Sequence, residues 1–155
     1  MKIGVLGGGS WATALAMLLA GKGHDVEIWV RSESQAKEMS ISRTNKKYLP
    51  DIILPDSINV NVSIDEVVHN KEILLLGVPT NSVREILIKL EGRVDKEQIF
   101  VNVAKGIEIG SMKRISEIVG EYFPYNDFVV LSGPSHAEEV SRNIPTTIVS
   151  ASEKK

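Results

Sequence analysis

The sequence contains no cysteine, and this absence removes several kinds of chemistry. A chain without thiols has no disulfides, no thiolate nucleophile and no thiolate ligands for a metal. The three histidines, His24, His69 and His136, are scattered and do not form a cluster with the spacing of a zinc site. We therefore expect no metal in this protein, and we interpret His136 as structural or solvent-facing.

A long hydrophobic run and an excess of one charge are absent as well. No apolar stretch approaches the length of about 18 residues that is typical of a membrane-spanning helix, and the first residues show no signal-peptide pattern. The 18 Lys and Arg residues nearly balance the 20 Asp and Glu residues, and the two signs are mixed along the chain. We therefore expect a cytoplasmic protein with no membrane span and no nucleic-acid partner.

What the sequence does contain is a set of short, continuous apolar runs, which are typical of strands covered on both faces. We expect strands at 2–6, 26–30, 73–78, 99–104, 128–131 and 146–149, with a weaker candidate at 58–62. Between them, apolar residues recur with helical spacing within 12–19, 83–90 and 115–122. The alternation predicts one α/β domain of the Rossmann type, a doubly wound, mainly parallel sheet with helices on both faces.

Glycine, proline and helix-capping residues indicate where some of these elements begin and end. Gly21 and Gly23 stand where the first helix should stop. The segment 43–57 is polar, contains two prolines and is long for a connection, so we expect an irregular, functional loop there. The spacing of a helix capping box occurs in the pairs Ser32–Gln35, Ser82–Glu85 and Ser135–Glu138.

The strongest motif is the glycine-rich segment GGGSWA at 7–12. It matches G-x-G-x-x-A, directly after a predicted strand and at the start of a predicted helix, as a dinucleotide site requires. Gly7 permits the tight turn, Gly9 lets the backbone approach a pyrophosphate, and Ala12 lets the helix pack close to the sheet. The N–H groups at the helix start then attract phosphates. A purely structural glycine turn is the simpler alternative.

The end of the second predicted strand bears on the choice of cofactor, because an acidic residue there holds the ribose hydroxyls in NAD-specific sites. This chain has Arg31 and Ser32 at that place. An arginine can bind a 2′-phosphate or stack on adenine, so we expect NADPH rather than NADH. Glu27 lies inside the strand and is a poor substitute for the acid, whereas Glu33 could still contact a ribose. An exposed arginine at a strand end is the structural alternative.

Four segments carry a resemblance to a known family. They are GGGSWATAL at 7–15, NKKYLP at 45–50, AKGIE at 104–108 and SGPSHA at 132–137. In order and spacing they resemble the N-terminal domain of bacterial NAD(P)-dependent glycerol-3-phosphate dehydrogenases, and the last two are the most specific together. The resemblance covers essentially the whole chain. It implies reversible reduction of dihydroxyacetone phosphate to sn-glycerol 3-phosphate, a backbone of phospholipids, with NADPH or NADH.

The resemblance also implies roles for individual residues. The implied cofactor contacts are Gly7, Gly9, Ser10, Trp11, Arg31, Ser32, Tyr48, Lys105 and Ala137, and the implied substrate contacts are Lys105, Gly133 and Ser135. Lys105 and Gly133 follow predicted strands, at the edge of the sheet where open α/β folds bind ligands. A lysine there can bind an anionic substrate or polarise a carbonyl as hydride arrives.

Each of these side chains also has a simpler interpretation. Lys105 is alternatively a solvated loop lysine, and Trp11 a packing residue beside the helix start. Ser135 is alternatively a helix cap that works with Glu138, and Tyr48 a plain exposed aromatic residue.

One motif of the family has no counterpart in this sequence. The family carries its general acid/base lysine in a second, mostly helical domain, in a segment resembling G-A-x-K-N, where it protonates the alkoxide oxygen. No segment here matches it. We therefore expect no catalytic residue within this chain. We also expect the chain to be part of a longer protein and, by itself, to bind nucleotide but to turn over substrate poorly.

Two other functions stay open at this point. The chain could be a non-catalytic dinucleotide-sensing module. It could also be the Rossmann half of another two-domain dehydrogenase, such as a ketopantoate reductase-like or sugar-acid dehydrogenase-like enzyme. The sequence does not determine the oligomeric state, and a homodimer of the longer protein is compatible with it.

Overall fold

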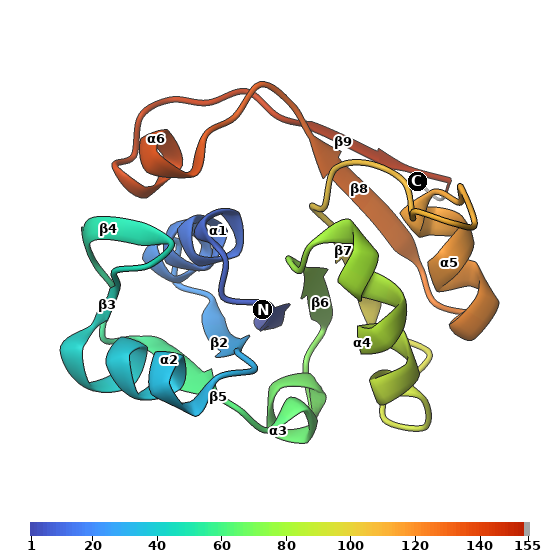
Figure 1. Ribbon diagram of the computed structural model, residues 1–155, viewed down its shortest axis with the longest axis horizontal. Coiled ribbons are helices and arrows are strands. Elements are labelled where there is room, and N and C mark those ends of the chain that lie inside the picture. Colours follow the sequence, from blue (N-terminus) through green and yellow to red (C-terminus); the bar gives the residue numbers. More distant parts are fainter. Residues whose placement is uncertain (154–155) are drawn as a thin grey trace.

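The computed structural model describes residues 1–153, and a seven-stranded sheet runs through its centre (Figure 1). In their order across the sheet, the strands are β5 (Ile58–Asn61), β2 (Asp25–Trp29), β1 (Lys2–Leu6), β6 (Ile73–Leu76), β7 (Ile99–Asn102), β8 (Phe128–Ser132) and β9 (Val149–Ser152). All neighbouring pairs are parallel except β8 with β9. The chain winds outward from β1 in one direction and then from β6 in the other. This confirms the predicted Rossmann-type fold.

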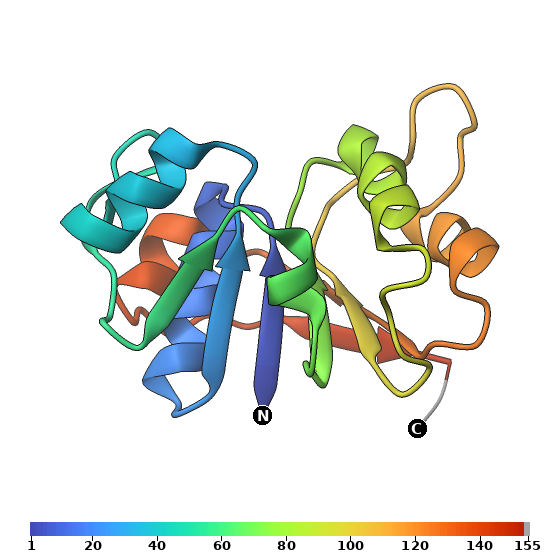
Figure 2. The same ribbon diagram turned by 90° about the horizontal axis from the view of Figure 1, so that it is seen from below.

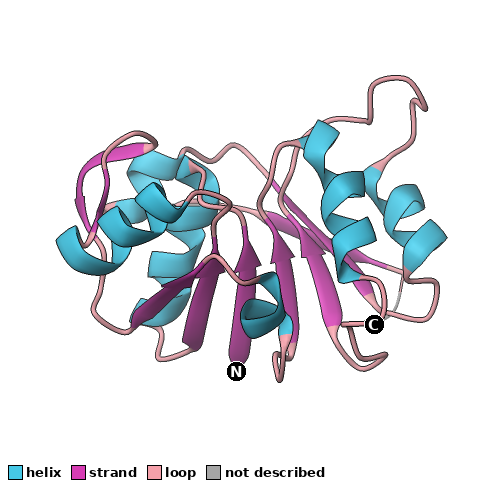
Figure 3. Ribbon diagram, turned by 60° about the horizontal axis from the view of Figure 1, so that its bottom comes forward, coloured by secondary structure: helices cyan, strands magenta, loops and turns pink. Residues whose placement is uncertain are grey.

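Helices cover both faces of the sheet, as Figures 2 and 3 show. The helices are α1 (Ser10–Gly21), α2 (Glu33–Lys37), α3 (Ile64–Val68), α4 (Val83–Leu90), α5 (Ile115–Tyr122) and α6 (Ala137–Ser141), which packs against α1, with a π-helical turn at Glu38–Ser42 and a 3₁₀ turn at Thr80–Ser82. Successive residues of β1 point to opposite faces of the sheet. Ile3 and Val5 pack with α1, whereas Leu6 packs with α4 and α5. This two-sided burial explains why the strands read as continuous apolar runs.

Of the three serines at capping-box spacing, only Ser32 caps a helix, and none of the three pairs forms the full box, because the Gln35 side chain donates to Gly8 and Asn45 instead. At Ser32 the hydroxyl does accept the N–H of Gln35 and caps α2. Ser82 does not cap α4, because the preceding 3₁₀ turn leaves it with helical φ and ψ angles instead of the extended backbone that a cap needs. Helix α6 begins one residue later than predicted, with His136 at the cap position, so Ser135 does not cap it either.

One end of the sheet and the segment 43–57 depart further from the sequence-based expectation, whereas β5, at the other end, matches the weaker strand candidate at 58–62. The predicted strand at 146–149 is wrong in position, because β9 begins only at Val149 and runs antiparallel along β8. All of its residues are exposed, so an apolar run does not mark it. The segment 43–57 is also less irregular than expected. It contains the antiparallel pair β3 (Thr44–Asn45) and β4 (Leu49–Ile53).

A close contact joins the first helix to the centre of the sheet. A methyl group added at Gly77, directly after β6, would lie 2.6 Å from the Cβ of Ala12 in α1. Ala12 itself is fully buried. A small residue is therefore needed on both sides of this contact, as the motif predicts for Ala12.

We expect the Gly77→Ala variant to lose about 1–3 kcal/mol of unfolding free energy, because its methyl group overlaps Ala12 and forces α1 outward. Denaturant titration of the chain measures this. Gly120→Ala in α5 is the matched control, because a methyl there meets no atom within 4 Å and should be neutral or stabilising. Equal stability of the two variants would show that the contact does not constrain the fold.

Candidate functional site

The glycine turn between β1 and α1 leaves the start of the helix open. Gly7 adopts a φ of 125°, a conformation that side chains disfavour. Gly9 is the N-cap residue of α1 and supplies no side-chain cap, so the first N–H groups of the helix lack an acceptor within it. A Cβ at Gly9 would meet no atom within 4 Å. The turn thus offers unobstructed backbone donors, which suits an anionic group.

Beside this turn lies a pocket that collects residues from distant parts of the chain. Its volume is about 310 Å³, and it is lined by Ser10, Trp11, Val103, Lys105, Ser135, His136, Ala137 and Glu138. Five of the predicted contacts, Ser10, Trp11, Lys105, Ser135 and Ala137, therefore meet in one place. The exposed His136 also lines this pocket, although the sequence indicated no role for it there.

Lys105 ties together the loops that follow three strands. Its exposed ammonium group donates to the Gly133 carbonyl over 3.1 Å, and its own carbonyl accepts from the hydroxyl of Thr80 over 2.8 Å. The Ser135 hydroxyl donates to the same Gly133 carbonyl over 3.4 Å. Lys105, Gly133 and Ser135 are thus neighbours. Because a Cβ at Gly133 would lie 2.8 Å from the Thr147 carbonyl, this position also requires glycine.

The predicted adenosine-side residues lie outside this pocket. Arg31 is exposed and follows β2. The hydrogen bond and the charge of Lys89 lower the pKa of Glu85, and the charge of Arg31 adds a smaller effect in the same direction. Ser32 is exposed, with its hydroxyl bonded to Ser34 over 2.7 Å. Glu27 is committed to an ion pair with Lys71 over 2.9 Å, which agrees with its interpretation as a poor substitute for a ribose-binding acid.

Tyr48 lies on the turn between β3 and β4 and is 41% exposed. The Lys47 ammonium sits 5.0 Å from the centre of its ring. The neighbouring Leu49 is buried in a small cluster with Ala14 of α1 and Ala137 of α6. This anchor holds the turn beside α1, but Tyr48 does not line the pocket, and its contact with a cofactor stays a prediction.

The sequence did not reveal an ion-pair network behind Lys105. Arg84 of α4 binds both carboxylate oxygens of Glu108 at 2.9 Å and also reaches Glu121 and the Tyr122 hydroxyl of α5. The hydrogen bond from Arg84, followed by that from Ser111, lowers the pKa of Glu108 to about 2. The hydrogen bond to Glu108, followed by those to Glu121 and Tyr122, raises the pKa of Arg84 above its ordinary value. The network fixes the segment after Lys105 to α4 and α5.

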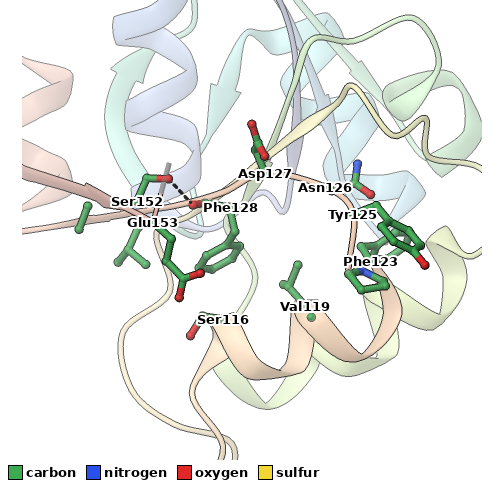
Figure 4. A pocket seen from close by; sticks show the side chains of 13 residues that line it. Ser116, Val119, Phe123, Tyr125, Asn126, Asp127, Phe128, Ser152 and Glu153 are labelled. Atoms are coloured by element: carbon green, nitrogen blue, oxygen red, sulfur yellow. Dashed lines mark hydrogen bonds between the residues drawn. The ribbon is translucent and has the colours of Figure 1, made fainter. Parts of the chain in front are cut away.

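A larger groove lies far from these residues. It has a volume of about 490 Å³ and is lined by one side of α5, the loop 123–127 that follows it, β8 and the end of β9 (Figure 4). Figure 4 shows the ring of Phe128 and the side chain of Val119 facing it, and the Ser152 hydroxyl bonded to the Phe128 carbonyl over 3.0 Å. The groove sits at the amino end of β8, whereas ligands of open α/β sheets bind at the carboxyl ends. We therefore place the candidate site at the smaller pocket.

Comparisons with known proteins show which family and which relatives the chain resembles. A family model described as NAD-dependent glycerol-3-phosphate dehydrogenase N-terminus matches residues 2–155. The chain is similar to the glycerol-3-phosphate dehydrogenase [NAD(P)+] of Thermoanaerobacter sp., with 51% identity over 98% of this chain and 46% of that protein. The corresponding protein of Lysinibacillus sphaericus is 46% identical over 97% of this chain and 45% of its own length.

A solved structure extends the likeness to three dimensions. The glycerol-3-phosphate dehydrogenase of Coxiella burnetii superposes with a TM-score of 0.93 at 31% identity, over 99% of this chain and 47% of that one. The chain thus spans about half the length of the relatives that it matches. Within residues 1–153, no helix combines the length and the apolar character needed to cross a bilayer.

The Arg84–Glu108 pair should make stability depend on pH in a defined window. The carboxyl group of Glu108 has a pKa of 4.5 when unperturbed and about 2 in the folded chain. The pair therefore stabilises the folded state fully above pH 4.5, and this contribution is lost as the pH falls toward 2. We expect the melting temperature of Glu108→Gln to lie below that of the wild type by a constant amount near neutral pH. The difference should shrink between these two pKa values.

Melting curves over this pH range measure the effect. Glu85→Gln is a suitable control, because its ion pair with Lys89 is exposed and contributes little. A melting-temperature difference for Glu108→Gln that stays constant down to pH 2 would contradict the assignment of the network to Glu108.

Proposed function

Because the chain belongs to the family of NAD-dependent glycerol-3-phosphate dehydrogenase N-terminal domains, we propose that it is the dinucleotide-binding part of such an enzyme. The proposed reaction is the reversible NAD(P)H-dependent reduction of dihydroxyacetone phosphate to sn-glycerol 3-phosphate, in the cytoplasm. The observation that carries the proposal is the pocket at the carboxyl edge of the sheet. There Ser10, Trp11, Lys105 and Ala137 meet beside the open start of α1.

The residues of the glycine turn fit a dinucleotide. The pyrophosphate is proposed to lie against the N–H groups of Gly9, Ser10 and Trp11, because these begin α1 without an internal acceptor. The open space at Gly9 admits a phosphate oxygen without a clash. Arg31 is proposed to bind the 2′-phosphate of NADPH, with Ser32 beside it, and Tyr48 to flank the adenosine. The bound nicotinamide supplies the hydride.

Lys105 is the proposed link between cofactor and substrate. Its ammonium group lies on the Gly133 carbonyl, next to the Ser135 hydroxyl, so a cation and a hydroxyl converge at one end of the pocket. A phosphorylated three-carbon ketone presents a dianion and a carbonyl. A fixed ammonium group can hold the former or polarise the latter. The proposal assigns the general acid/base lysine to a further domain of a longer protein.

The alternatives have weaker support. A ketopantoate reductase-like or sugar-acid dehydrogenase-like half would share the fold, but the family match and the AKGIE and SGPSHA segments favour the glycerol-3-phosphate dehydrogenases. A non-catalytic sensing module would need the same glycine turn, but it would have no need of the substrate-side residues that surround Lys105.

Calorimetric titration of the purified chain with NADPH and NADH tests the cofactor assignment. We expect saturable binding that is tighter for NADPH, because Arg31 faces solvent without an ion-pair partner among residues 1–153. Arg31→Ala should weaken NADPH binding by about tenfold or more and change NADH binding little. Lys96→Ala, which removes an exposed charge before β7, controls for the change in net charge. Tighter binding of NADH would keep the fold and overturn the role of Arg31.

The same chain should not reduce dihydroxyacetone phosphate at an enzymatic rate, since no general acid is assigned within it. Spectrophotometric oxidation of NADPH in the presence of the ketone measures this. A robust rate from the purified 155-residue chain would refute the assignment of the acid/base lysine to a further domain.

A further inference from the structure

The middle glycine of the turn is held by two side chains from outside the motif. The Gly8 carbonyl accepts from Asn45 Nδ2 over 2.9 Å and from Gln35 Nε2 over 2.7 Å. Gln35 also donates to Asn45 Oδ1 over 3.3 Å. A Cβ at Gly8 would lie 2.4 Å from Val30 and 2.7 Å from Gln35, so only glycine fits against these donors.

This carbonyl determines where the next backbone donor points. The peptide bond between Gly8 and Gly9 is trans, and the C=O and N–H of a trans peptide point in opposite directions. Two donors that hold the Gly8 carbonyl on the side of Asn45 and Gln35 therefore turn the Gly9 N–H to the other side. The same bonds draw a partial negative charge away from the place where a pyrophosphate is proposed to lie.

The side chain of Asn45 is buried in the interior of the protein. It is 2% exposed, and its second N–H donates to the hydroxyl of Thr13 in α1 over 2.9 Å. Thr13 is fully buried as well. An amide that is buried with all its donors satisfied has a defined orientation, because any rotation would leave polar groups unpaired. Asn45 thus couples the β3–β4 hairpin to the glycine turn.

Building on the proposed function, we propose that Asn45 is a positioning residue for the dinucleotide site. It acts through the Gly8 carbonyl and does not itself touch the cofactor. Gln35 supports it from α2, and the hairpin that carries Tyr48 becomes part of the same arrangement. A shift of the hairpin would therefore reach the phosphate-binding donors through a single side chain.

The test compares Asn45→Ala and Asn45→Asp with Thr13→Val. The first two variants remove both donors of residue 45, whereas Thr13→Val removes only the Asn45–Thr13 bond and leaves the bond to Gly8. All three should lower the melting temperature. Only the Asn45 variants should weaken NADPH binding, by about tenfold, the effect of one lost hydrogen bond in the binding-competent turn. Calorimetry is run at a temperature where every variant is folded.

A second readout needs no cofactor. In ¹⁵N–¹H spectra of the free chain, the Gly8 and Gly9 amide signals should shift in Asn45→Ala and stay in place in Thr13→Val. The proposal is overturned if folded Asn45→Ala binds NADPH as the wild type does. It is also overturned if Thr13→Val loses as much affinity, because Asn45 would then only pack the hairpin. A wild-type chain that binds neither NADPH nor NADH would count against the proposed function, while the amide signals would still decide the role of Asn45.

Discussion

The close approach of α1 to the carboxyl ends of β1 and β6 is the constraint on which the rest of the structure depends. Gly7 reverses the chain with a positive φ, and a Cβ there would lie 2.7 Å from the Gly77 carbonyl. Gly77 in turn leaves room for Ala12. Because the helix starts this close to the sheet, its first N–H groups open onto the crevice where the winding of the sheet reverses. The position of the candidate site follows from three small residues.

Much of this arrangement could be predicted from sequence, because the signals are local. Strands covered on both faces appear in the sequence as apolar runs, and the buried face of α4 appears as apolar residues at helical spacing. Both patterns arise because the environment of the side chains repeats along each element. Strand β9 and the β3–β4 hairpin were not predicted, because the contacts that hold them do not repeat along their own residues. Strand β9 is exposed and pairs on one side, and the β3–β4 hairpin is held by contacts of Arg43 with the Pro55 and Ile58 carbonyls.

The same distinction between local and long-range signals applies to the candidate site. The family resemblance implied that Ser10, Trp11, Lys105, Ser135 and Ala137 contact cofactor or substrate, and the structure brings them to one pocket. The residues that orient them could not be predicted. Asn45 reaches Gly8, and Arg84 reaches Glu108, only after the chain has folded. Asn45 belongs to the NKKYLP segment and Glu108 to the AKGIE segment, but neither segment indicates which distant group these side chains meet in the fold.

A chain with a net charge of -2 that binds a polyanionic dinucleotide needs local attraction, because its overall field provides none. The proposed site supplies this attraction in separate places: the start of α1, the exposed Arg31 and the ammonium group of Lys105. Arg84 binds the segment that follows Lys105, but Glu108 and Glu121 neutralise its charge, so it acts as a structural cation. The division is physically consistent. The cations that we propose to meet a ligand are solvent-accessible, whereas Arg84, which fixes the segment after Lys105, is already paired with carboxylates and is not available to a phosphate.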